Sequence, residues 1–297
     1  MTTKDDSKWI RFLAGALASN SAEIVTLPID CTKVRLQSQG MMASSSGSAH
    51  LVRYDGMLDA MLKISRHEGP STLWSGLSPA LIRQVSYSSL CMVLYEPFRN
   101  AIAGSNPEKD ITFLQKLAAG GIAGAISISI ANPVDVIKVR MQADRSGTLY
   151  KGVTDASFKI FKSEGMRGFA RGVWPNIQRG FIINAAELGT YDHTKTALNK
   201  YGITGIGSHL GASFVAGFAG AAASNPVDVL KTRLMTQPAG HRALYRGMTD
   251  CLLKTVRHEG FAALYNGFIP NWMRKGPWCV IFFVTYEQYK LVLNQLY

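Results

Sequence analysis

One short motif occurs three times in the chain, and this repetition constrains the fold more than any other feature. The copies begin at Pro28, Pro133 and Pro226, and each reads Pro-x-Asp-x-x-Lys-x-Arg. The proline of each copy removes a backbone donor and can kink a helix, while the aspartate and the lysine, three residues apart, project side by side. A period of about 100 residues is too long for common solenoid units and predicts a triplicated, domain-sized module.

The remaining motifs recur with the same period. Each copy continues with a Glu-Gly pair and then with a Gly-x-x-Pro element that has an arginine seven residues after its glycine. Each copy ends with a tyrosine followed by an acidic residue, and a basic residue comes three positions after the acid. The arginines of the Gly-x-x-Pro elements are Arg83, Arg179 and Arg274. We therefore predict three repeats, residues 1–105, 106–202 and 203–297, that form one integrated transmembrane domain.

Hydropathy favours a membrane protein. Residues 117–134 carry no charged side chain, and residues 201–227 carry none apart from His209, which suits spans of about 20 residues each. We predict an all-α fold, in which six transmembrane helices and three short amphipathic surface helices form a pseudo-threefold barrel. The expected spans are Trp9–Gln39, Pro79–Ile102, Thr112–Ala143, Pro175–Lys200, Ile206–Thr236 and Pro270–Asn294, and the expected surface helices are Gly56–Arg66, Gly152–Ser163 and Gly247–His258.

Two details of these helices are also expected from the pattern. Small residues recur at spacing four before each motif proline, as Gly15 and Ser19 do in the first copy, and such spacing allows helix backbones to approach closely in a membrane. The segment from Gly40 to Val52 is rich in Ser and Met, and we expect a variable or disordered surface loop there.

The charges of the repeated motif predict a ring. Local pairs at a solvated helix end would be worth only about half a kcal/mol each. Threefold placement favours instead a ring in which the lysine of one helix meets the aspartate of the next and closes one end of a central cavity. Its members are Asp30, Lys33, Asp135, Lys138, Asp228 and Lys231. A second ring near the other membrane face is expected from Glu96, Arg99, Asp192, Lys195, Glu287 and Lys290. Two such rings that open alternately describe a transporter.

The three arginines predict an anion site between the rings. Guanidinium groups present forked donors that match carboxylate, phosphate or sulfate oxygens, and we place these arginines about midway along the second helix of each repeat. Glu23 and Glu187 are acids with no acidic counterpart in the other repeats. We expect these two acids either to offset part of the excess positive charge or to carry a proton together with the anion.

Several other function classes find no support. The chain has no nucleophile elbow, Walker loop or paired Cys/His cluster, so we expect neither an enzyme nor a metal site. The net charge of +12 is compatible with anionic lipid or substrate, but no stripe of basic and aromatic residues indicates nucleic acid. The four cysteines lack paired spacing and are expected to be reduced thiols. The first residues do not resemble a secretory signal or a transit peptide, so any targeting signal is expected to be internal.

These motifs resemble the mitochondrial carrier family over residues 9–293. The resemblance implies a multi-pass, six-helix barrel of the inner mitochondrial membrane. Such a barrel exchanges solutes by alternating access. It makes the Asp/Lys ring the matrix gate and the second ring the cytoplasmic gate. It also assigns Gln37 and Gln142 as glutamine braces of the matrix gate, whereas Met235 departs from the pattern and should leave the third ion pair unbraced.

Within that family the chain is similar to the uncoupling-protein and dicarboxylate-carrier branch, especially to its brain and kidney-type members. Glu187 and Trp278 belong to segments that carry this likeness, and the three arginines fall on the branch's substrate contact positions. Cys91 replaces an arginine of the thermogenic member, which argues against regulation by purine nucleotides. The resemblance also implies cardiolipin as the bound lipid, held at helix N-termini. Its expected positions are Gly56, Gly76, Gly152, Gly172, Gly247 and Gly267.

The sequence leads to one main function and two alternatives. The main one is a monomeric antiporter of small anions, which are dicarboxylates or inorganic oxyanions such as sulfate, thiosulfate or phosphate. The first alternative is a proton leak like that of an uncoupling protein, and the second is a carrier fold retained as a structural subunit of a respiratory complex.

Overall fold

The computed structural model describes residues 8–46, 54–103, 113–144, 149–202, 206–237 and 244–296. Within these ranges every regular element is a helix, and no strand is present. The prediction of an all-α fold is therefore confirmed.

Six of the helices in the described ranges are long, two from each repeat. They are α1 (Lys8–Ser46), α3 (Leu77–Ala103), α4 (Phe113–Ala143), α7 (Val173–Lys200), α8 (Ile206–Thr236) and α10 (Phe268–Leu296). The expected bounds agree to within a few residues except at the end of α1, which continues to Ser46. The first part of the expected loop after Gly40 is therefore helical, and residues 47–53 lie outside the described ranges. Pro28, Pro133 and Pro226 lie inside α1, α4 and α8, so the helices continue through the motif prolines.

A short amphipathic helix follows the first long helix of every repeat. These are α2 (Met57–His67), α5 (Val153–Glu164) and α9 (Met248–Glu259), close to their expected bounds. Each is followed by a further helical turn that the sequence did not predict, namely η1 (Pro70–Trp74), α6 (Met166–Phe169) and η3 (Phe261–Tyr265).

The recurrent glycines make the turns between these elements. The glycine of each Glu-Gly pair and the glycine of each Gly-x-x-Pro element have positive φ, for example 62° at Gly165 and 76° at Gly172. Side chains rarely adopt this conformation, so glycine is required at both turns. The second glycine is also crowded, because a Cβ at Gly76 would lie 3.2 Å from the carbonyl oxygen of Lys138 on α4.

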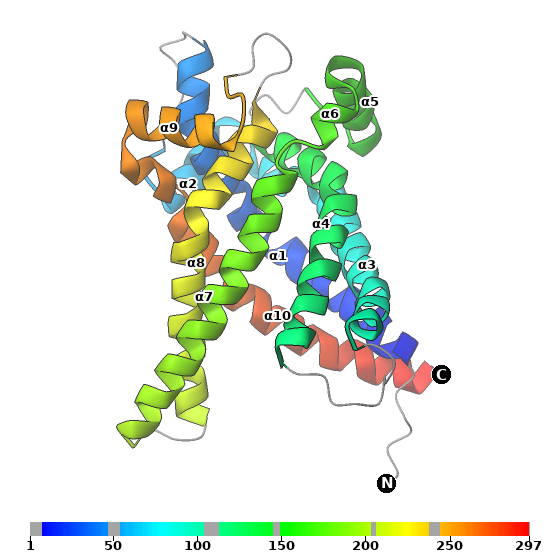
Figure 1. Ribbon diagram of the computed structural model, residues 1–297. Coiled ribbons are helices and arrows are strands. Elements are labelled where there is room, and N and C mark those ends of the chain that lie inside the picture. Colours follow the sequence, from blue (N-terminus) through cyan, green and yellow to red (C-terminus); the bar gives the residue numbers. More distant parts are fainter. Residues whose placement is uncertain are drawn as a thin grey trace.

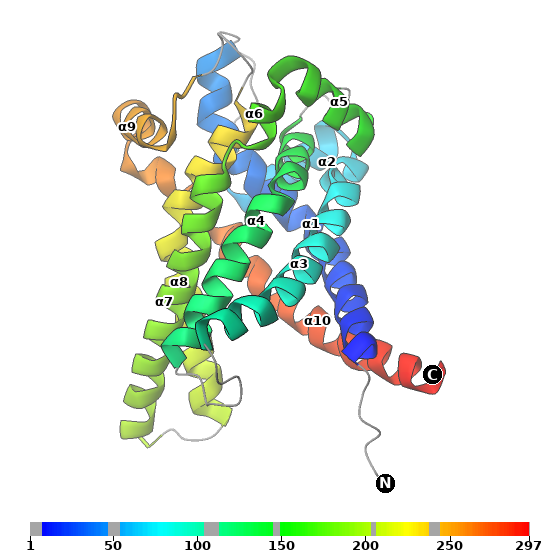
Figure 2. The same cartoon turned by 45° about the vertical axis from the view of Figure 1, so that its right-hand side comes forward.

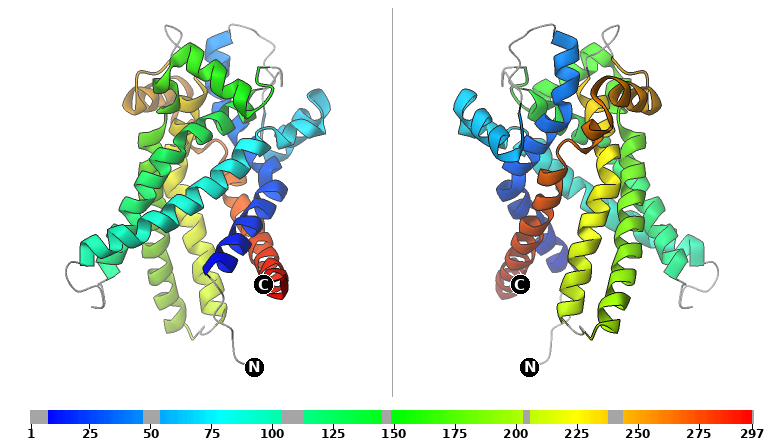
Figure 3. Two further views of the ribbon diagram at one scale, coloured as in Figure 1. Left: turned by 90° about the vertical axis from the view of Figure 1, so that its right-hand side faces the viewer. Right: turned by 90° about the vertical axis from the view of Figure 1, so that its left-hand side faces the viewer.

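The six long helices surround a space that is wide at one end and narrow at the other. They converge toward the end that carries α2, α5 and α9 and diverge toward the end where α1 begins and α10 ends (Figures 1, 2 and 3). The most extensive contacts join helices of different repeats, namely α3 with α4, α7 with α8, and α10 with α1. The two long helices of one repeat contact each other much less.

Alanines rather than the predicted glycines form the close helix contacts. Ala14, Ala18 and Ala22 are fully buried on α1, whereas a Cβ added at Gly15 would meet no atom within 4 Å. On α4, Ala119 and Ala123 are buried and Gly124 likewise faces open space. The close backbone approach expected at these glycines is therefore absent, because the packed stripe is displaced by one residue.

Two of the described long helices contain a segment that is long and apolar enough to cross a membrane by composition, Phe12–Gln39 in α1 and Ala118–Ala143 in α4.

Candidate functional site: a charged network beneath a central cavity

Three ion pairs connect the first long helices of the repeats in a ring. Lys33 on α1 lies 2.9 Å from Asp228 on α8, and Lys138 on α4 lies 2.6 Å from Asp30 on α1. Lys231 on α8 closes the ring at 3.2 Å from Asp135 on α4. The side chains of the three aspartates are at most 9% exposed. The structure thus brings together all six residues of the predicted ring, each lysine with the aspartate of another repeat.

Two asparagines bridge two of these ion pairs. Asn176 on α7 accepts a hydrogen bond from Lys231 at 2.9 Å and donates one to Asp135 at 2.8 Å. Asn271 on α10 does the same for Lys33 and Asp228, at 2.8 and 3.2 Å. Sequence reasoning missed both residues, although the signal was present, since each follows the proline of a Gly-x-x-Pro element. The same position of the first repeat is Ala80, so the third ion pair has no such bridge.

The predicted glutamine braces are found at only one of two positions. Gln142 donates a long hydrogen bond of 3.4 Å to Asp30 and so contacts the Lys138–Asp30 pair. Gln37 does not contact its predicted pair. Its amide oxygen accepts a hydrogen bond of 2.6 Å from Thr232, and its Nε2 is buried without a partner among the described residues.

The third pair, Lys231–Asp135, has an asparagine bridge, and no glutamine of the described ranges contacts it. Met235, which replaces the glutamine, packs its side chain against Gly172, where an added Cβ would come within 2.8 Å of it. The Lys231–Asp135 pair that would have lacked a brace is instead the one bridged by Asn176.

Each gate aspartate also binds one of the three predicted arginines. In all three, Oδ2 faces the lysine and Oδ1 faces the arginine. The distances are 3.0 Å for Arg83 to Asp135 and 2.7 Å for Arg274 to Asp30, and Arg179 contacts Asp228. The arginines therefore lie in the first two turns of α3, α7 and α10, at the narrow end of the barrel. Their predicted position midway along these helices, apart from the ring, is wrong.

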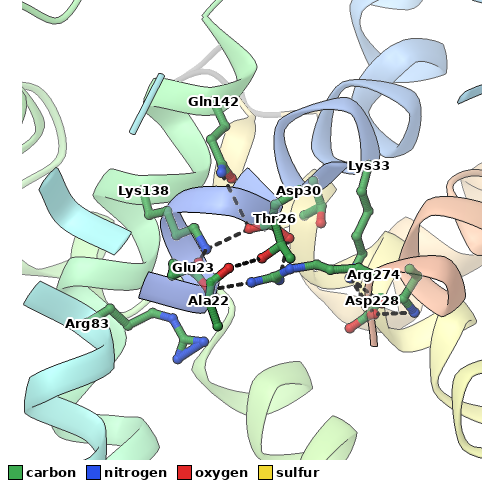
Figure 4. Close-up of polar contacts among 12 residues, drawn as sticks. Ala22, Glu23, Thr26, Asp30, Lys33, Arg83, Lys138, Gln142, Asp228 and Arg274 are labelled. Atoms are coloured by element: carbon green, nitrogen blue, oxygen red, sulfur yellow. Dashed lines mark hydrogen bonds and ion pairs between the residues drawn. The ribbon is translucent and has the colours of Figure 1, made fainter. Parts of the chain in front are cut away.

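The two asymmetric acids are both paired with cations. Glu23 is only 2% exposed, and its oxygens bind Lys138 at 2.7 Å and Arg274. Glu187 on α7 contacts Lys275 on α10 and is about one third exposed. Figure 4 shows Glu23, Asp30, Lys138 and Arg274 gathered in one cluster beside α1.

A cavity of about 1730 Å³ opens above this network. Its wall includes all six residues that the sequence predicted to bind substrate, which are Glu23, Arg83, Arg179, Glu187, Arg274 and Trp278. Aromatic side chains contribute to the rest of the wall, among them Phe181, Phe214 and Trp272. The cavity therefore has a cationic floor and largely apolar sides, which is an arrangement that can orient a small anion.

A second set of buried arginines ties the repeats together at the narrow end. Arg35, Arg140 and Arg233 are the last residues of the three motif copies, and each binds the glutamate of a Glu-Gly pair, for example Arg140 to Glu164 at 2.6 Å. Each also donates from Nε to a backbone carbonyl of the next repeat, as Arg140 does to Met235 at 2.8 Å. The sequence carried the signal, since arginine and glutamate recur at fixed offsets, but offsets alone did not show that they meet.

The comparison of the chain with known families agrees with this threefold geometry. The family described as Mitochondrial carrier protein matches residues 4–106, 109–202 and 204–296, one match for each repeat. The chain belongs to this family. It is therefore a carrier, not an enzyme, and a multi-pass protein of the mitochondrial inner membrane.

Individual relatives cover nearly the whole carrier. Kidney mitochondrial carrier protein 1 of Xenopus laevis is 44% identical over 95% of this chain and 97% of its own length. Mitochondrial uncoupling protein 3 of Arabidopsis thaliana is 40% identical over 98% of this chain and 96% of its own length. The human Putative mitochondrial transporter UCP3 is 39% identical over 97% of this chain and 93% of its own length.

The predicted cytoplasmic-gate residues lie near the C-terminal ends of α3, α7 and α10, where the carrier is widest (Figure 2). The side chains of Glu96, Asp192 and Glu287 are exposed. Their role as a gate stays a prediction.

The predicted cardiolipin glycines all precede helices of the carrier. Gly56, Gly152 and Gly247 stand at the N-termini of α2, α5 and α9, which have no side-chain cap. A Cβ added at any of these three glycines would meet no atom within 4 Å, so the space beside each helix end is open. This geometry fits a lipid phosphate at the amide groups, and the site stays a prediction.

Proposed function

We propose that the carrier exchanges small dianions across the membrane by alternating access. The observation that carries this proposal is the direct contact between the cavity arginines and the gate aspartates, which joins the anion site to the gate. Seven cationic side chains and five carboxylates form the network, so its net charge is +2. A net charge of +2 favours a dianion, such as a dicarboxylate, sulfate, thiosulfate or hydrogen phosphate.

The proposal includes a topology. The six long helices span the membrane, α2, α5 and α9 lie at the matrix surface with cardiolipin at their N-termini, and residues 1–105, 106–202 and 203–297 act as one monomeric unit. In this conformation the Asp/Lys ring closes the matrix side, and the cavity opens toward the intermembrane space. Substrate that enters from that side meets the arginines first, which weakens their contacts with the gate.

The test combines binding with transport. Purified carrier in mild detergent is heated with sulfate, thiosulfate, phosphate, succinate and malate in turn, because a ligand that binds only the folded state raises the melting temperature. An anion that raises it is then tested for exchange in liposomes. We expect a shift with at least one dianion, and no shift and no exchange with the Arg179→Ala variant. Wild-type carrier that neither binds nor exchanges any of these anions would overturn the proposal.

Proton leak is the second candidate, because relatives that are 40% identical are named uncoupling proteins. The carboxylate version of this hypothesis needs a glutamate that can take up a proton. Both oxygens of Glu23 instead bind cations, and Glu187 contacts Lys275, so uptake of a proton by either acid would weaken an ion pair. The same liposomes, loaded with a pH-sensitive dye, test this alternative. We expect equal proton conductance in wild-type, Glu23→Gln and Glu187→Gln carriers, and a loss in either variant would support the leak.

A further inference from the structure

The three arginines of the cavity floor are not equivalent, although the repeats place them at the same position. Arg274 donates hydrogen bonds from both terminal nitrogens, Nη1 to Asp30 at 2.7 Å and Nη2 to Glu23. Arg83 and Arg179 approach their aspartates most closely through Nε. The terminal nitrogens of these two arginines make no hydrogen bond to a residue within the described ranges. The two terminal nitrogens are therefore already hydrogen-bonded in Arg274, whereas those of Arg83 and Arg179 are available to a ligand.

The two terminal nitrogens of Arg274 belong to a closed group of four charged side chains around two carboxylates of the first repeat. Lys138 and Arg274 each bridge the same two carboxylates, Glu23 and Asp30. We call these four residues the quartet. Glu23 contacts the lysine of this cluster, as an asparagine does in each of the other two, and the residue of the first repeat that corresponds to these asparagines is Ala80. Two cations and two carboxylates make the quartet electrically neutral.

The excess charge of the network therefore lies in the other two clusters. Asp135 binds Lys231 and Arg83, and Asp228 binds Lys33 and Arg179, so each of these clusters carries one uncompensated positive charge. Glu187 and Lys275 neutralise each other. The net charge of +2 thus belongs to the clusters of Arg83 and Arg179, whose side chains are 29% and 32% exposed to the cavity, compared with 21% for Arg274.

Arg83 and Arg179 line the same cavity. In Figure 4 the guanidinium group of Arg83 extends from α3, and no dashed line joins it to the quartet.

We infer that the carrier holds its dianionic substrate between Arg83 and Arg179, one negative charge at each, and that Arg274 belongs to the gate and is not a ligand. This inference rests on the proposed function. It replaces a threefold anion site by a twofold one, with the third arginine held by Glu23. Because the aspartates occupy Nε, an anion at the terminal nitrogens of Arg83 and Arg179 leaves the matrix ring intact, so the present conformation is the one that loads substrate.

The test uses three matched substitutions, Arg83→Lys, Arg179→Lys and Arg274→Lys. Lysine keeps the charge, and therefore the gate ion pair, but it lacks the fork that binds an oxyanion through two hydrogen bonds. Titration of each purified variant with sulfate and with succinate measures the dissociation constant through the melting temperature. We expect binding weakened about tenfold or more by Arg83→Lys and by Arg179→Lys, because each removes a charge-assisted hydrogen bond. Arg274→Lys should leave it within about twofold.

The two probes separate two kinds of dianion. Sulfate carries both charges on one compact group, whereas succinate carries them on two separate carboxylates. If the affinity for one probe falls in both Arg83→Lys and Arg179→Lys, dianions of that kind bridge the two arginines.

A second measurement follows from the neutrality of the quartet and does not depend on the lysine variants. Glu23→Gln removes one negative charge, so the network becomes more positive by one unit. Citrate is a trianion. The ratio of the melting-temperature shift with citrate to the shift with succinate should therefore be larger for this variant than for the wild type. An unchanged ratio would contradict the neutral quartet.

The outcomes distinguish this inference from the proposed function. Wild-type carrier that binds no anion would overturn the proposed function and the inference together. Wild-type carrier that binds a dianion, but loses it equally in all three lysine variants, would overturn the inference alone and restore a threefold site.

Discussion

At the residue scale, the asparagines show how much of the gate depends on neutral side chains. Asn176 joins both members of the Lys231–Asp135 pair, the longest of the three, through hydrogen bonds to charged groups. We expect Asn176→Ala to lower the free energy of unfolding by about 1–3 kcal/mol, because it leaves two buried charged groups each one hydrogen bond short. The melting temperature in mild detergent should fall by several degrees.

Asn184 provides the matched control for this prediction. It lies on the same helix and lines the cavity, but it forms no hydrogen bond to another residue of the described chain. Asn184→Ala should therefore leave the melting temperature nearly unchanged. Equal losses in the two variants would show that the asparagine bridge contributes no specific stability.

The sequence predicted the members of the matrix ring but not their full coordination. A fixed spacing of aspartate and lysine, repeated three times, was sufficient to predict pairing between repeats. Which oxygen binds the arginine, and whether Gln37 turns toward Asp228 or toward Thr232, depends on side-chain conformation and on the neighbouring helix. Periodicity holds no information about either.

At the element scale, α2, α5 and α9 each begin with the same local device. In α5, Asp155 accepts hydrogen bonds from Lys159 at 2.8 Å and from the backbone N–H of Lys151 at 2.9 Å. The hydrogen bond from Lys159 holds the pKa of Asp155 below its ordinary value. A carboxylate with a lowered pKa stabilises the fold above its unfolded pKa, and this contribution is lost as the pH falls through the folded pKa.

We therefore predict that Asp155→Asn accelerates amide hydrogen exchange at residues 151–156 at neutral pH. The difference from wild type should shrink only as the pH is lowered through the depressed pKa of Asp155, which is below the ordinary pKa of an aspartate, because the wild-type carboxylate loses its charge there. Lys162→Gln is the control, since Lys162 lies on the same helix and forms no ion pair with a described residue. A difference that persists unchanged at acid pH would show that the ionised carboxylate is not responsible.

Helix bounds were largely predictable, whereas the short turns after the surface helices were not. Long apolar periodicity and motif prolines defined the six long helices. Elements such as η1 and α6 span only five and four residues, which is too short for a periodic pattern. The close contacts formed by alanine instead of glycine were also missed, because glycine and alanine alternate along these helices and spacing alone fits either.

At the scale of the whole molecule, the cysteines can report which end of the barrel is open. Cys279 on α10 is exposed and lines the cavity, whereas Cys31 and Cys251 are buried. Burial also raises the pKa of the Cys251 thiol to about 11, so this thiol is unreactive at neutral pH. In a Cys91→Ser background, a polar maleimide therefore reports on Cys279.

We predict that removal of the matrix ring lowers this reactivity. The triple variant Lys33→Ala, Lys138→Ala and Lys231→Ala leaves three buried aspartates without their lysines, which destabilises the conformation described here relative to one closed at the wide end. The labelling rate of Cys279 should fall several-fold. The triple variant Lys63→Ala, Lys159→Ala and Lys254→Ala removes exposed lysines at equivalent positions and should label at the wild-type rate. Equal rates in both variants would contradict control of access by the ring.

The pairing of helices across repeat boundaries has a consequence for how the chain is made. Among the described helices, α1 is synthesised before all the others, and it packs most extensively against α10, which is synthesised after all the others. The two long helices of a single repeat have few contacts with each other, so a newly synthesised repeat lacks the partner that stabilises it. Contacts between such distant parts of a chain slow folding. The barrel therefore matures only after synthesis of α10 is complete, and α1 remains exposed to other partners until then.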